Sequence, residues 1–190
     1  LIVDAASGKD AKIISETKIA GGANAGSNYY ETVTPRDMLV NGDKLVLFAD
    51  APQKNIVFNQ YDITPYPQYS DETAVYIYDI RNRKNPKLDK NITISGRYFE
   101  SRMVGNYVYA IAQAPVGGGP IIMPMIRAGA GRIAPPVYYF KHPEPDYQFS
   151  TIASIDLQSG AVADAKSFML GYSNTLMMSQ DNIYIAYQKY

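Results

Sequence analysis

The fold is decided by residues 73–113, which read TAVYIYDIRNRKNPKLDKNITISGRYFESRMVGNYVYAIAQ. Apolar and aromatic residues alternate over residues 73–80, a polar turn follows, and a second strand-like run reaches residue 95. Residues 98–113 repeat this hairpin pattern around Gly105-Asn106. Branched and aromatic side chains favour strands, because they suit a pleated, half-buried surface. The stretch therefore predicts two consecutive β hairpins.

Two kinds of hairpin alternate along the whole chain. One kind begins with an alternating run that closes on an acidic residue, at residues 1–5, 73–80 and 149–157. The other kind has a tight central turn, at residues 38–50, 101–113 and 176–187. We letter the four strands of one sheet a to d from the inside outward. In these letters the hairpins follow one another along the chain in the order c–d, a–b, three times.

Four-stranded units that repeat along a chain are typical of a β-propeller, in which sheets called blades stand around a channel. The fold class that we predict is therefore all-β, with a propeller arc of four-stranded antiparallel blades. Two alternatives remain open at this point. One is a β-sandwich of short strands, and the other contains a helix over residues 10–20, where Ile13, Ile14 and Thr17 fall near helical spacing.

The turns specify how the strands connect. Asn41-Gly42-Asp43, Gly105-Asn106 and Asp181-Asn182 are residue types that accept the positive φ of tight primed turns. We predict antiparallel hairpins in meander order, because short turns join neighbouring strands. The runs concerned are 38–50, 73–95, 98–114, 149–171 and 175–188. In a meander of this kind the short turns lie at one edge and the long connections, 20–36, 51–72 and 115–148, at the opposite edge.

Residues 73–111 and 167–187 carry a resemblance to a known family. They resemble secreted prokaryotic, largely archaeal, proteins with a C-terminal β-propeller domain distantly related to WD repeats. The most specific parts are GRYFESRMVGNYVY, residues 96–109, and residues 75–88, which also look like the LVIVD type of propeller repeat. The likeness begins at about Met38 and covers most of the chain after it. The resemblance implies a propeller and export to the outside or the cell surface; the function of that family is uncharacterised, and no catalytic residues transfer from it.

The strand order also predicts how complete the propeller is. The chain opens on a c strand and closes on a b strand, so its two terminal halves would add one blade to the two between them. Propellers have about four to eight blades, and a ring of about three cannot close. We therefore expect one partial propeller domain over residues 1–190, with insertions at about 51–72 and 115–148. It is either an arc of a larger propeller or a chain that self-associates to complete the ring, since open edges invite aggregation.

Composition excludes several classes of function. The 18 Lys and Arg residues balance the 18 Asp and Glu residues, so no broad positive field attracts nucleic acid or anionic lipid. The chain has no cysteine and one histidine, which excludes a disulfide framework, a thiolate site and a multi-histidine metal site. The apolar stretch at residues 120–131 is too short to span a membrane and contains two prolines and an arginine. No signal peptide is visible in the first residues, so export rests on the resemblance.

The candidates for catalysis are weak. His142 is followed by two prolines, Pro143 and Pro145, and lies near Glu144 and Asp146, but neither a nucleophile elbow nor a second histidine accompanies it. The glycine-rich residues 115–132 lack the lysine of a phosphate-binding loop, so we interpret them as a flexible insertion. We predict no catalytic residues and no cofactor.

Two surface signals remain. Asp62, Asp71 and Glu72 offer oxygen ligands but lack the spacing and the glycine of a calcium loop, so no metal site is predicted. Asn91-Ile92-Thr93 matches the acceptor pattern for N-glycosylation.

The long connections carry many tyrosines beside prolines. The candidate binding residues among them are Tyr66, Tyr69, Tyr138, Tyr139 and Tyr147. Tyrosine buries a large area at low entropic cost and keeps a polar tip, which suits recognition of a protein or a carbohydrate. The competing interpretation is that these rings only pack the loops onto the sheets. The sequence thus favours a noncatalytic binding or scaffolding module; the alternative is an enzyme with a channel-centred active site completed by blades absent from this chain.

Overall fold

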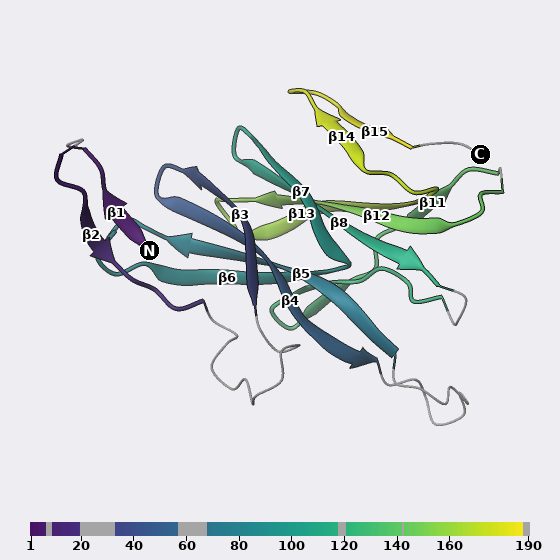
Figure 1. Ribbon diagram of the computed structural model, residues 1–190, viewed down its shortest axis with the longest axis horizontal. Helices are drawn as coiled ribbons and strands as arrows, with labels where there is room; N and C mark the ends of the chain where they lie inside the picture. The colour runs from purple at the N-terminus through teal and green to yellow at the C-terminus, as the bar shows by residue number, and fades with distance from the viewer. Residues whose placement is uncertain (7–8, 20–32, 57–67, 118–120, 142, 188–190) are drawn as a thin grey trace.

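The computed structural model describes residues 1–6, 9–19, 33–56, 68–117, 121–141 and 143–187. Every regular element in these ranges is a β strand, as Figure 1 shows. The helix considered for residues 10–20 is wrong, because Lys12–Ser15 form the strand β2. Branched residues such as Ile13 and Ile14 lose rotamer freedom in a helix and fit a strand better.

Two four-stranded antiparallel meanders form the body of the molecule. The first contains β3 (Thr34–Asn41), β4 (Lys44–Ile56), β5 (Gln68–Asp79) and β6 (Lys87–Ser95). The second contains β7 (Arg97–Val104), β8 (Tyr107–Val116), β12 (Tyr147–Asp156) and β13 (Ala161–Leu170). Within each meander, every strand pairs with the next one in order. The predicted meander order is confirmed.

A two-stranded hairpin flanks the meanders on each side. These hairpins are β1 (Ile2–Asp4) with β2 (Lys12–Ser15), and β14 (Thr175–Met178) with β15 (Ile183–Ala186). In the part of the chain that the structure describes, neither hairpin pairs with a further strand. They lie at opposite ends of the stack of sheets in Figure 1. The strand order is therefore two, four, four and two, as the c–d, a–b reading of the sequence predicts.

The segment between β8 and β12 adds strands to both sheets. β9 (Ile126–Ala128) and β10 (Gly131–Ile133) extend the first sheet beyond β6, and β11 (Val137–Tyr139) pairs in parallel with β13. The interpretation of residues 115–132 as flexible is wrong for β9 and β10. Edge strands offer unpaired backbone groups, and a short extended segment satisfies its own groups by pairing with them.

The hydrophobic core lies between the two sheets. Phe48 and Ile77 project from the first sheet, Val108 and Ile155 project from the second, and all four are fully buried. The alternate residues of β4 and β5 point to the other face of the first sheet, where a second cluster forms around Tyr78. Because both faces of this sheet are covered, residues 45–49 of β4 form an unbroken apolar run, LVLFA, rather than a polar and apolar alternation.

The short turns gather at one edge of the stack, as predicted. The Asn41 Nδ2 donates to the Gly105 carbonyl at 3.1 Å, and the Leu157 amide donates to the Asn106 carbonyl at 3.0 Å. A further hydrogen bond of 2.8 Å joins Asn106 Nδ2 to Asp156 Oδ1. The β7–β8 turn is thus linked to both the β3–β4 turn and the β12–β13 turn. β4 and β8 end at the opposite edge (Figure 1).

Glycine occupies the first loop position in two of the three tight turns that were predicted, and the turn at residues 179–182 has a different hydrogen-bond pattern. Gly42 and Gly105 have φ values of 55° and 58° and stand first in two-residue loops, the arrangement of a type II′ turn. The positive φ expected at Asp181-Asn182 is wrong, since no described residue other than glycine has positive φ. There the Ser179 amide donates to the Asn182 carbonyl at 2.9 Å, and the Asn182 amide donates to Ser179 Oγ at 3.0 Å.

Candidate functional site

Three consecutive aromatic side chains are exposed at the outer edge of the second sheet. Tyr138 is 48% exposed, Tyr139 63% and Phe140 59%. The Tyr138 ring stacks on its neighbour across the strand pair, Phe168, with centroids 5.6 Å apart. Tyr139 projects to the opposite face, because successive side chains of a strand alternate. We call Tyr138, Tyr139 and Phe140 the aromatic edge.

The backbone of the aromatic edge is fixed before any partner binds. Pro135 and Pro136 precede the strand and favour an extended chain. The Ser167 amide donates to the Pro136 carbonyl at 3.0 Å, and β11 then stays in register with β13 as far as Tyr139. Extended geometry and strand pairing therefore hold Tyr138 and Tyr139 on a regular element, and Phe140 directly follows it.

The other predicted tyrosines divide into two groups. Tyr147 begins β12, is half-buried, and its hydroxyl accepts the Glu144 amide at 2.9 Å, so it packs its own turn. Tyr69 lies in β5, but its side chain is outside the described part of the structure, as is all of Tyr66. The structure thus leaves Tyr138 and Tyr139 exposed on opposite faces of one strand and adds Phe140, which the sequence analysis did not select. His142 also lies outside the described residues.

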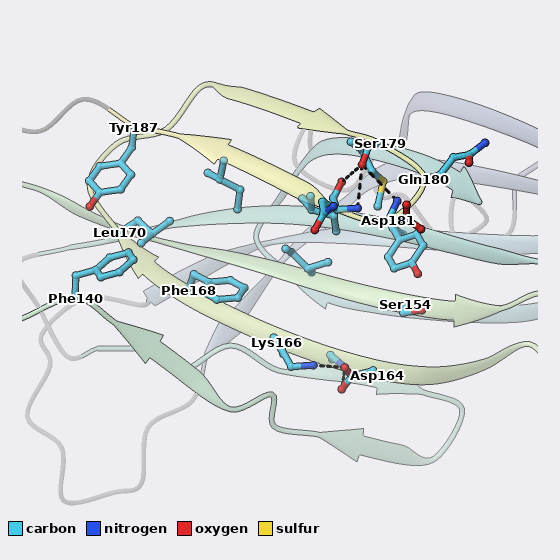
Figure 2. A pocket seen from close by; sticks show the side chains of 17 residues that line it. Phe140, Ser154, Asp164, Lys166, Phe168, Leu170, Ser179, Gln180, Asp181 and Tyr187 are labelled. Atoms are coloured by element: carbon cyan, nitrogen blue, oxygen red, sulfur yellow. Dashed lines mark hydrogen bonds and ion pairs between the residues drawn. The ribbon is translucent and has the colours of Figure 1, made fainter. Parts of the chain in front are cut away.

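A cavity of about 530 Å³ lies beside the aromatic edge, between the outward face of the second sheet and the hairpin β14–β15 (Figure 2). Its apolar end is formed by Phe140, Phe168, Leu170 and Tyr187. The turn between β14 and β15 borders its polar end with Ser179, Gln180 and Asp181. The Phe140 and Tyr187 rings stack with centroids 6.4 Å apart. No sequence pattern indicates this cavity, because its walls come from segments that are far apart in the chain.

An ion pair between Asp164 and Lys166 lies on the outer strand β13 where it lines the cavity. Hydrogen bonding to Lys166, and secondly to the Ala165 amide, lowers the pKa of the Asp164 carboxyl. The same hydrogen bond raises the pKa of the Lys166 ammonium. Both groups are therefore charged near neutral pH, and they give the apolar cavity a polar wall.

The innermost strands carry a buried polar cluster that the sequence reading missed. Asp37 Oδ2 on β3 accepts the Ser101 hydroxyl at 2.8 Å and the Tyr98 hydroxyl at 3.1 Å, both from β7. The two hydroxyls lie 3.0 Å apart. Burial, and to a smaller extent the nearby Asp37 charge, raises the pKa of Tyr98 to about 12, so its phenol remains a donor. These groups satisfy one another's hydrogen-bonding capacity and join β3 to β7. We call Asp37, Tyr98 and Ser101 the brace between the two sheets.

Removal of the brace carboxylate should destabilise the fold. We expect Asp37→Ala to lower the free energy of unfolding by about 1–3 kcal/mol, because the hydroxyls of buried Ser101 and half-buried Tyr98 lose their acceptor. Asp43→Ala, in an exposed turn, is the matched control and should change it by less than about 0.5 kcal/mol. Urea denaturation followed by far-UV circular dichroism measures both values. Equal effects of the two variants would show that the cluster is no brace.

The structure also describes the surroundings of two of the three acidic residues considered as metal ligands and of the candidate glycosylation site. Asp71 pairs with Arg97 at 2.8 Å, and Glu72 pairs with Arg127 of β9, so both carboxylates are matched by arginine. No group of three or more metal-ligating side chains occurs in the described ranges, and Asp62 lies outside them. Asn91 is exposed on β6, where the acceptor pattern is accessible. The same ranges contain no helix long and apolar enough to cross a membrane.

Comparison with known proteins agrees with this architecture. Residues 1–190 match the family model described as a beta propeller domain, so the chain belongs to that family. The chain is also similar to an uncharacterised protein of Methanocaldococcus jannaschii, with 28% identity over 115 residues. That match covers 58% of this chain and 18% of the relative, so the chain spans less than a fifth of the relative's length. No solved structure matches the chain significantly. The two four-stranded meanders are accordingly called blades below.

Proposed function

We propose that this domain is a noncatalytic binding or scaffolding module of an exported or cell-surface protein. The observation that carries the proposal is the aromatic edge, three consecutive exposed rings of which two lie on a paired strand and the third directly follows it. Its partner is a protein or a carbohydrate. Exposed aromatic groups of this kind are uncommon on surfaces that only face water, and aromatic side chains are enriched at recognition surfaces.

The physical chemistry of the edge supports recognition. Tyr139 has few rotatable bonds, so ordering it against a partner costs little entropy, and its hydroxyl adds a hydrogen bond at the rim. Stacking of Tyr138 on Phe168 orders a second ring in advance. A surface prepared in this way loses less free energy on binding than a loop that must first become ordered.

Two further parts of the proposal concern context. Export is proposed from the family resemblance, and in an exported protein the exposed Asn91 would be open to glycosylation. Completion of the ring is proposed, either by further blades of a larger propeller or by self-association, because each flanking sheet contains only two strands among the described residues. Neither of these parts requires a cofactor or a catalytic group.

A single substitution tests the binding role. On arrays of polysaccharides and extended peptides, Tyr139→Ala should weaken binding to the ligand that the natural chain selects by about tenfold or more, roughly 1.4 kcal/mol. Tyr107→Ala is the matched control, because Tyr107 is 44% exposed at the opposite, short-turn edge and should leave binding unchanged. The proposal fails if both variants bind as the natural chain does, or if no array ligand binds at all.

A further inference from the structure

The two larger sheets end in four edge strands among the described residues, and three of these strands carry features that hinder pairing with another chain. Edge strands expose unpaired N–H and C=O groups, and proteins protect them with charges, prolines or bulges. β3 contains Pro35, and its register shifts between Pro35 and Asp37. The register of β7 shifts between Tyr98 and Glu100, and β10 has the charged Arg132 at its centre.

The fourth edge strand, β11, has no such protection. Its residues 137–139 read VYY, and its register with β13 is regular. β13 is its single neighbour among the described strands, so one side of β11 is unpaired. This side lies at the end of the sheet opposite the innermost strand β7. Blades of a propeller meet face to face around the channel, so added blades would leave this outer side open.

The hydrogen-bond pattern identifies the free backbone groups of β11 as those of Val137 and Tyr139. The Ser167 amide donates to the Pro136 carbonyl at 3.0 Å, so the Pro136 carbonyl is directed toward β13. Successive residues of a strand direct their backbone groups to opposite sides, so Val137 and Tyr139 direct theirs away from β13. Each of these residues has one N–H donor and one C=O acceptor. The open side therefore offers two donors and two acceptors at the spacing of a strand.

The chain segment that carries this edge is basic. Residues 101–143 contain no Asp or Glu. Arg132 and Lys141, which precede and follow β11, are exposed and have no ion-pair partner among the described residues. The Asp164 carboxylate on the neighbouring strand β13 is already paired with Lys166. Two unpaired cations that flank β11 in the chain therefore favour a partner that carries carboxylates.

We infer that the partner of the aromatic edge is an extended peptide with acidic residues, which pairs as an added strand with the open side of β11. The inference deepens the proposed function, on which it rests, by selecting a peptide of another protein over a carbohydrate. The peptide backbone would form hydrogen bonds with Val137 and Tyr139. Its carboxylates would pair with Arg132 and Lys141. Main-chain hydrogen bonds supply affinity in this kind of recognition, and alternate side chains supply specificity.

The exposed rings fit an added strand better than a sugar. Tyr138 and Tyr139 project to opposite faces of the sheet and are 48% and 63% exposed. The side chains of an added strand alternate in the same way, so successive peptide side chains would pack on one ring and then on the other. A sugar ring stacks on one aromatic face and would leave the backbone groups of the edge unused. A peptide therefore uses all the features of this edge together.

The test is an array of short peptides that alternate valine and threonine and carry either glutamate or lysine at both ends, beside a panel of polysaccharides. The natural chain should bind the glutamate peptides about tenfold more tightly than the lysine peptides, or by a larger factor. Arg132→Glu combined with Lys141→Glu should reverse this preference, because the charges that flank β11 change sign.

Backbone pairing is tested separately with two versions of the glutamate peptide, each N-methylated at alternate amides. One version should lose binding by about tenfold or more, because its methyl groups replace the donors that face β11. The other version should retain binding, because its methyl groups point away from the edge. The two versions have the same composition and are matched controls for each other.

Three results would overturn the inference: equal binding of the two methylated versions, equal binding of glutamate and lysine peptides, or selection of polysaccharides alone. In the last case, a loss of polysaccharide binding in Tyr139→Ala would still support the binding role of the aromatic edge. A chain that binds nothing on the array would contradict both the inference and the proposed function.

Discussion

Replacement of Gly96 by alanine should destabilise the domain by about 4 kcal/mol or more, which is exceptional for one methyl group. Gly96 joins the two blades and has a φ of 105°, a conformation that other residues rarely adopt. A Cβ at this position would lie 2.7 Å from the backbone carbonyl carbon and oxygen of Gln113. Because the obstacle is backbone of the neighbouring strand β8, it cannot rotate away. We expect the melting temperature to fall by roughly 10 °C or the chain to aggregate.

Gly42→Ala is the control that isolates the close approach. Gly42 also has positive φ, at 55°, but a Cβ there would meet nothing within 4 Å. Gly42→Ala should lower the free energy of unfolding by only about 1–2 kcal/mol, the penalty for placing alanine at a positive φ. Differential scanning calorimetry of the two variants gives the comparison. Similar losses of stability would mean that Gly96 does not approach the backbone of β8 as closely as described.

The second large effect is expected at Phe48, which is fully buried between the blades. Its ring lies 5.6 Å from that of Tyr98, so it contacts the brace between the innermost strands as well as the core. Phe48→Ala should lower the free energy of unfolding by about 3–5 kcal/mol, since it removes a large apolar group and leaves a cavity. Chemical denaturation measures the loss.

Phe140→Ala removes the same side chain from the aromatic edge and serves as the control. Phe140 is 59% exposed, so its loss should change the stability by less than about 1 kcal/mol. A loss at Phe140 as large as that at Phe48 would show that the edge belongs to the core. The aromatic edge would then be a packing element, and the proposed binding role would lose its support.

Local sequence signals were sufficient for the hairpins of both blades. Gly42 and Gly105 each start a two-residue turn with positive φ, and alternating residues on both sides make the pairing register almost unambiguous. The same signal exists at Gly129, with a φ of 58° between β9 and β10, but its glycine-rich surroundings obscured it. Because β9 and β10 contain only three residues each, the turn residues are the main local signal for this hairpin.

Long-range pairings could not be predicted from the sequence. Val137–Tyr139 join β13 in parallel, a pairing that no hairpin turn announces. Asp37 and Tyr98 are 61 residues apart and meet only because the two innermost strands stand side by side. The cavity has the same origin, since it arises where an outer sheet face meets a hairpin of only two strands. Each of these features depends on how the sheets stack, which turn residues and periodicity do not encode.

The most direct measurement for the claim that two packed four-stranded blades form the body of the molecule is amide hydrogen exchange along the chain. An isolated two-stranded hairpin is marginally stable and should exchange quickly, whereas a strand inside a four-stranded blade is protected. We predict slow exchange of the central strands β4, β5, β8 and β12 and fast exchange of β14 and β15. Equal exchange of β12 and of residues 175–186 would contradict the claim.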